Sequence, residues 1–185
     1  PAQKQAYEDF LGNQIAGYLA KQPDIVVKSR RQDDRDQGIS DGELDDCDVL
    51  IWWGHVRQRE VTFESGRRIV ERIKGGRLSL LALHSAHWST PFIEAMNDRS
   101  VSDALAKLPE DERQIVRVEP IRPAKYSAPG RNDPLTPSAE RIIDADGKPV
   151  LRVHLPNCCF PAYRPDGKAS HMRVLLSDHP IAKGI

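Results

Sequence analysis

The stretch DVLIWWG (residues 48–54) decides the fold class of this 185-residue chain. From Asp48 to Trp53 the side chains show no alternation between apolar and polar, and Gly54 ends the run. Such a run is typical of a β-strand that is buried on both faces. A second run of this kind, Leu78–Leu83, follows after an interval long enough for a helix. The sequence therefore predicts an α/β fold in which a helical crossover joins parallel strands of one sheet.

Helix-like segments flank and separate these two strands. Apolar residues recur at three- and four-residue steps in Gln3–Lys21 and in Thr62–Lys74, which predicts two amphipathic helices. A shorter helix is expected over Thr90–Asn97. Ile25–Val27 is β-branched and predicts a short strand, and the charged segment Arg30–Gly42 predicts a loop. The expected inner stripe of the second helix is Phe63, Ile69, Val70 and Ile73.

The second half of the chain has a different character, because prolines interrupt it repeatedly. We interpret residues 100–172, approximately, as an insertion in a single α/β domain that covers residues 1–185. Gln114–Val118 and Val150–Leu155 are its candidate strands, the latter after an Asp146-Gly147 turn. Arg173–Leu176 is expected to return to the main sheet.

Composition excludes several classes of partner. Lysine and arginine number 27, as do aspartate and glutamate, so neither a nucleic acid nor a membrane surface is expected as a partner. No segment has the ~20 consecutive apolar residues of a membrane helix. Three cysteines, Cys47, Cys158 and Cys159, do not form a disulfide framework and favour a reducing, cytoplasmic setting. The composition leaves homo-oligomer formation open.

Three motifs occur together in a distinctive order: DVLIWWGH (48–55), LLALHSAHWS (80–89) and HPIAKGI (179–185). With their helix-sized gaps, they resemble the ThuA-like (trehalose utilisation) family of the class I glutamine amidotransferase-like superfamily. The resemblance covers most of residues 1–100 and 173–185. It implies a flavodoxin-like, doubly wound parallel sheet whose first strand and C-terminal part are missing from this chain. It also implies use of trehalose or related disaccharides through keto-sugar intermediates.

Histidines gather where the two apolar strands end. In an open parallel sheet, ligands bind beyond the carboxyl ends of the strands, where His55, His84 and His87 are expected. They could act as acid/base groups, bind a divalent metal such as zinc, or only cap the strands. In the amidotransferases a cysteine occupies the strand-to-helix elbow, which here reads His84-Ser85-Ala86-His87. Glutamine hydrolysis by that route is therefore not expected, and no nucleotide cofactor is implied.

Other side chains near these strand ends are candidates for substrate binding. Trp53 and Trp88 could stack on a sugar ring, although tryptophans on a buried strand more often pack against helices. Ser85 shares the histidine turn, and without a Gly-x-Ser-x-Gly pattern it is a poor nucleophile candidate. Arg57 and Glu60 could bind hydroxyl groups, and Glu60 could be a general base if its pKa were raised.

Two weaker candidates lie in the second half of the chain. Cys158 and Cys159 match no zinc-site spacing and are expected to be buried hydrophobic residues, and His179 could reach the pocket or only form a turn.

Two functions remain open on this sequence. The first is an enzyme that acts on a disaccharide or keto-sugar by isomerisation, lyase cleavage or hydrolysis. The second is a non-catalytic sugar-binding or regulatory module on an amidotransferase-like fold, because fold alone does not decide function. Convergence of the histidines on one open cavity would favour the enzyme.

Overall fold

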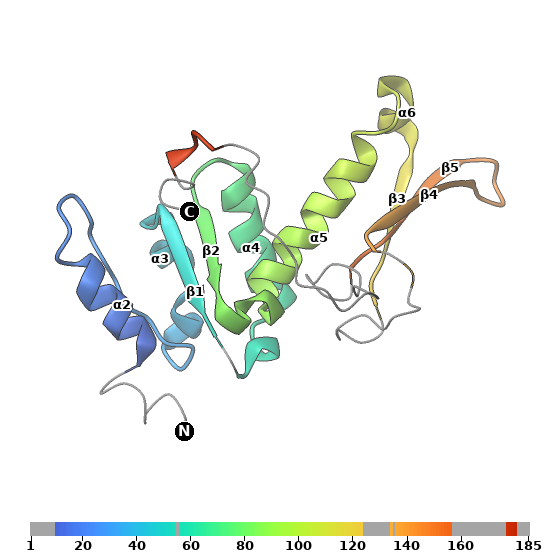
Figure 1. The fold of residues 1–185 in the computed structure, drawn as a ribbon. Helices are drawn as coiled ribbons and strands as arrows, with labels where there is room; N and C mark the ends of the chain where they lie inside the picture. The colour runs from blue at the N-terminus through green and yellow to red at the C-terminus, as the bar shows by residue number, and fades with distance from the viewer. Residues whose placement is uncertain (1–9, 55, 124–133, 135, 157–176, 181–185) are drawn as a thin grey trace, which may run out of the picture.

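A computed structural model shows an α/β protein (Figure 1) and describes residues 10–54, 56–123, 134, 136–156 and 177–180. The described α-helices are α2 (Leu11–Leu19), α3 (Asp41–Asp45), α4 (Phe63–Lys74), α5 (Thr90–Leu105) and α6 (Glu110–Ile115). The described strands are β1 (Val49–Trp53), β2 (Ser79–Leu83), β3 (Arg117–Ile121), β4 (Ser138–Ile143) and β5 (Pro149–His154). Three short 3₁₀ turns accompany them: η1 (Arg35–Gly38), η2 (Gln58–Glu60) and η3 (His84–Trp88). None of these helices has the length and apolar character needed to cross a membrane.

β1 and β2 form a parallel pair, as the two apolar runs predict. Trp53 at the end of β1 lies beside Leu83 at the end of β2, so both strands finish at one edge of the sheet. α4 is the crossover between them, and Leu50 and Trp52 of β1 pack toward the core on one face. The buried members of that core are Ile39, Leu44, Val61, Ile69 and Leu78.

The prediction that these strands are buried on both faces is wrong for the opposite face. Successive residues of a strand point to opposite faces, so Val49 and Ile51 point away from Leu50. Val49 is 55% exposed, and Leu81, the partner of Ile51 in the register, is 48% exposed. Burial on both faces needs neighbouring elements on each side, and among the described residues this sheet consists of two strands.

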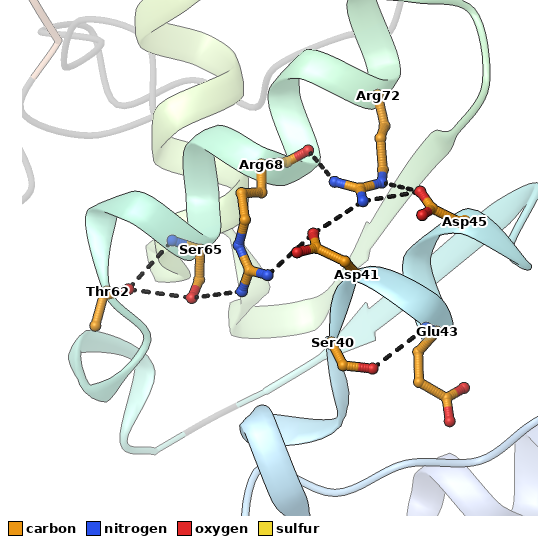
Figure 2. A network of polar contacts seen from close by, with 8 residues as sticks. All are labelled: Ser40, Asp41, Glu43, Asp45, Thr62, Ser65, Arg68 and Arg72. Atoms are coloured by element: carbon orange, nitrogen blue, oxygen red, sulfur yellow. Dashed lines mark hydrogen bonds and ion pairs between the residues drawn. The ribbon is translucent and has the colours of Figure 1, made fainter.

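Helix α4 is fixed at its start and along one flank by polar contacts (Figure 2). The Thr62 hydroxyl caps the helix by accepting a hydrogen bond from the Ser65 amide, which would otherwise have no helical partner. Arg72, whose side chain is only 18% exposed, contacts Asp41 at 2.9 Å and Asp45 at 2.8 Å. Arg68 contacts Asp41 at 3.1 Å. These pairs hold α3 against α4 on the flank of the core.

Helices α4 and α5 approach each other closely at Gly66. A Cβ atom at this position would lie 2.9 Å from Cγ of Glu94 and 3.1 Å from Cγ2 of Thr90. Glu94 is almost fully buried, and both of its carboxylate oxygens accept hydrogen bonds from Arg122, at 2.7 and 2.9 Å. The Arg122 guanidinium also lies over the Phe63 ring, 4.9 Å from its centre. The crossing therefore combines a small residue with a paired buried carboxylate.

The second sheet has the order β3–β5–β4, with β5 parallel to β3 and antiparallel to β4. Its apolar face packs on the C-terminal half of α5, where Ala104 is buried with Leu151, Val153 and Leu155. Figure 1 shows α5 reaching from α4 to this sheet. The predicted Asp146-Gly147 turn is confirmed as the hairpin between β4 and β5, with Gly147 at a φ of +78°.

Several predictions on the N-terminal part differ from the structure. Ile25–Val27 is not a strand, and Val26 is 92% exposed, because β-branched residues form a stable strand only against a partner. Helix α2 starts at Leu11, while residues 3–9 of the predicted helix lie outside the described part. Phe63 is exposed rather than part of the inner stripe, whereas Ile69 and Val70 are buried as predicted.

Boundaries in the second half also differ. The helix predicted to stop at Asn97 continues to Leu105, because its later turns find the second sheet to pack on. The strand predicted over Gln114–Val118 begins at Arg117, since α6 occupies the preceding segment with acidic residues in its first turn. Strand β4 was not predicted because half of its side chains are polar and do not form a clear alternating pattern with the apolar ones. The strand predicted at Arg173–Leu176 lies outside the described residues.

Candidate functional site

The two loops at the sheet edge each hold a left-handed residue: Arg57 in the loop after β1 and His84 in the turn after β2. His84 directly follows the strand and has a φ of +54°, in the left-handed region that side-chain-bearing residues rarely adopt. Its ring stacks on that of Trp53 at the end of β1, with centres 5.9 Å apart and planes at 17°. Strained residues of this kind persist where the surrounding structure holds them, often at functional sites. His84 therefore occupies a strand-to-helix elbow, exposed and beside an aromatic ring.

His87 lies on the next turn and is oriented by the same elbow. Its Nδ1 atom lies 3.2 Å from the carbonyl oxygen of His84, which makes Nδ1 the protonated nitrogen in the neutral ring. The Trp88 ring is tilted against it, with centres 5.2 Å apart. Ser85, in the same turn, is half-buried. The structure thus places His84, Ser85, His87 and Trp88 on one turn, with Trp53 against the first of them.

Arg57 and Glu60, the predicted hydroxyl-binding residues, are paired with each other. Glu60 accepts hydrogen bonds from Arg57 at 2.7 Å, and Arg57 also contacts Asp33 at 2.7 Å. Hydrogen bonding from Arg57 lowers the pKa of the Glu60 carboxyl group. A general base at neutral pH needs a raised carboxyl pKa, so the Glu60 hypothesis is not supported. The three side chains instead join the loop that contains Asp33 to the loop that follows β1.

Two glutamines reinforce the same junction between loops. The Gln32 side-chain amide donates to the Arg57 carbonyl, and the Gln37 amide donates to the Glu60 carbonyl, each at 3.0 Å. Gln37 itself has a φ of +58°. These contacts give the loop after β1 a fixed backbone beside the histidine turn.

Gln58 was missed by sequence reasoning, yet it connects the ends of both strands. Its side-chain Nε2 donates to the carbonyl oxygen of Ser85 at 2.6 Å. Its Oε1 would lie 3.1 Å from a Cβ atom at Gly54, the residue that ends the β1 run. The Thr90 hydroxyl donates to the Val61 carbonyl at 2.7 Å and ties α5 to the same loop. A glutamine in a polar loop carries no sequence signal for such a contact.

The metal hypothesis depends on a residue outside the described part. Within the described ranges, no group of three histidine, cysteine, aspartate or glutamate side chains is placed to hold a metal ion. His84 and His87 could supply two ligands, but the His87 Nε2 atom is shielded from solvent. His55, the third proposed ligand, is not described, and neither are Cys158 and Cys159. A metal therefore stays a prediction that rests on His55.

The chain was compared with family models, curated proteins and solved structures. None of the three comparisons found a match. Assignment of the site therefore rests on its geometry.

Two further residues, Cys47 and His179, have side chains that could be reactive. Cys47 packs against the core beside α3, and burial raises the pKa of its thiol, which makes it a poor nucleophile. His179 belongs to the described segment 177–180 and is exposed. Neither residue adds to the chemistry of the histidine turn.

Proposed function

We propose that this chain is a ThuA-like α/β domain that transforms a keto-sugar or keto-disaccharide at the carboxyl edge of its parallel sheet. The supporting observation is His84, held at a φ of +54° directly after β2 with its ring against Trp53. A doubly wound, flavodoxin-like sheet is part of the same proposal, with β1, α4 and β2 as its described unit.

The proposed chemistry is proton transfer at the carbon next to the sugar carbonyl. Histidine is a common general acid and base, and in this proposal His84 takes the proton from carbon and returns it. His87 lies on the same turn, with its Nδ1 atom against the His84 carbonyl and its Nε2 atom shielded, so its proposed part is to support the turn that presents His84. Trp53 and Trp88 offer aromatic faces that suit the apolar faces of a sugar ring. The elbow sequence has histidine where an amidotransferase has cysteine, so the proposed reaction is not glutamine hydrolysis.

The experiment is solvent-deuterium exchange, followed by proton NMR, on a panel of ketoses and keto-disaccharides. The active-site variant is His84→Asn, because asparagine tolerates the left-handed conformation and lacks the imidazole. We expect the wild type to exchange the proton next to the carbonyl and the variant to be slower by about 100-fold or more.

The matched control is His154→Ala, which removes a histidine from β5 in the other sheet, where it lies 3.5 Å from Glu140. Exchange by this control should equal that of the wild type. Equal exchange by wild type and His84→Asn would refute the proposal.

A second candidate function is sugar binding without catalysis. It is favoured by the low pKa of Glu60 and by the shielded Nε2 atom of His87, which limit the acid/base groups of the described site. Saturation-transfer NMR with the same sugars would separate the two functions. Contacts at the tryptophan rings without any deuterium exchange would support the binding module.

A further inference from the structure

We infer that Gln58 is the positioning residue of this site: its side-chain amide holds the histidine turn in the conformation that presents His84. An effect of Gln58 on catalysis presupposes the proposed function. Its hold on the turn is argued separately, from contacts at the ends of β1 and β2.

His84 has a left-handed backbone that is unfavourable for a residue with a side chain, so other contacts must hold it there. The next residue, Ser85, provides one of them, because its carbonyl oxygen accepts the 2.6 Å hydrogen bond from Gln58. This contact joins η2, on the β1 side, to η3, on the β2 side. It therefore acts across the sheet edge at the residue next to His84.

The side-chain amide of Gln58 fills the space beside Gly54. Its Oε1 atom is buried and has no hydrogen-bond partner among the residues that the structure describes. The absence of a side chain at Gly54 leaves room for this amide, since a Cβ there would approach Oε1 at 3.1 Å and Cδ at 3.4 Å. A buried amide oxygen without a partner is costly, so Gln58 is not placed there for stability alone. The hydrogen bond from its Nε2 atom to the Ser85 carbonyl is what this placement contributes to the site.

The side-chain amide of Gln58 can point in only one of its two orientations. Exchange of Oε1 and Nε2 would bring two oxygen atoms together at the Ser85 carbonyl, so the hydrogen bond fixes which way the amide points. Because His87 Nδ1 contacts the His84 carbonyl, a shift of the turn would move both histidines. Gln58 thus acts on the backbone that the two histidines share, through the Ser85 carbonyl.

The experiment measures the histidine rings and the reaction separately. Gln58→Met keeps the side-chain length and removes the donor, and Gly54→Ala displaces the same amide from the opposite side. The matched control is Gln32→Met, which removes a glutamine-to-carbonyl bond from the same loops but not from the turn. Each protein is examined by two-dimensional NMR of histidine rings, with His84 assigned through His84→Asn, and by thermal unfolding.

We expect the His84 resonances, shifted by the Trp53 ring, to move toward their unfolded positions in Gln58→Met and in Gly54→Ala. They should stay in place in Gln32→Met, with all three proteins still folded. Deuterium exchange on the active sugar should then fall in kcat, by about 10-fold or more, with KM little changed.

Each outcome decides a separate claim. Unmoved His84 resonances in Gln58→Met would overturn the positioning role, as would moved resonances with wild-type kcat. Absence of exchange in the wild type would refute the proposed function, while the resonances would still decide whether Gln58 holds the turn.

Discussion

Replacement of Gly66 by alanine should destabilise the protein, although alanine favours helices. In an open helix this change gains about 1 kcal/mol. Here the new Cβ would lie 2.9 Å from Glu94 Cγ, 3.1 Å from Thr90 Cγ2 and 3.3 Å from the Thr90 carbonyl oxygen. These neighbours cannot easily move, because Glu94 is held by both nitrogens of Arg122 and the Thr90 hydroxyl is held by Val61.

Overpacking of a core typically costs 1–3 kcal/mol. The 2.9 Å approach to Glu94 Cγ places this site in the upper part of that range, about 2–3 kcal/mol. After the helix gain of about 1 kcal/mol is subtracted, we expect Gly66→Ala to lose about 1–2 kcal/mol of unfolding free energy. For a chain of this size that loss corresponds to a decrease in Tm of roughly 2–8 °C. Urea unfolding followed by circular dichroism would measure the free energy, and calorimetry would measure Tm.

The control is Gly17→Ala in α2, where no atom lies within 4 Å of the new Cβ. It should gain up to about 1 kcal/mol, since only the helix term acts. If Gly66→Ala were as stable as the wild type or more so, the tight crossing of α4 and α5 would be refuted.

Three further predictions concern other parts of the fold. Thr62→Ala removes the cap of α4 and should cost about 1 kcal/mol in urea unfolding, whereas Ser65→Ala, which keeps the amide donor, should cost less. Asn97→Leu should raise stability by about 1 kcal/mol, because both amide atoms of this buried residue lack partners among the described residues; a loss would show that the amide is bonded. The pKa values of Asp41 and Glu60 are lowered, chiefly by hydrogen bonds from Arg72 and Arg57, so their contribution to stability is present above about pH 4 and is lost as pH falls through the folded-state pKa values. Thermal unfolding from pH 7 to pH 3 should therefore show a shallower acid decrease in Arg57→Met than in the wild type, and equal slopes would contradict the pairing.

The sequence predicted individual helices, strands and turns better than it predicted the elements that pack against them. The apolar runs that become β1 and β2, the helix after Thr62 and the turn at Gly147 all have strong local signals, and each is confirmed. Burial of β1 was overestimated because it depends on which neighbours the strand receives, and this is not a local property. Ile25–Val27 failed for the same reason.

The candidate site was predictable in its residue types and not in its contacts. Histidines and tryptophans after apolar strands are visible in the motifs, and the structure brings His84, His87, Trp53 and Trp88 together. The left-handed backbone at His84 has no signal in the sequence, because glycine or asparagine would be expected there. Gln58 was missed, because its part in the site depends on a hydrogen bond to the Ser85 carbonyl, 27 positions later in the chain.

Helix α5 couples the stability of the two sheets, because it contacts both. Its first turns are anchored beside the histidine turn through Thr90, and its last turns form part of the core of the second sheet through Ala104. One helix therefore packs against α4 near its start and forms part of the core of the second sheet near its end. Loss of the β4–β5 hairpin would remove the packing partner of the C-terminal half of α5. Unfolding of α5 from that end would then extend toward Thr90 and the histidine turn. Mutations far from His84 can therefore weaken its setting without any contact to it.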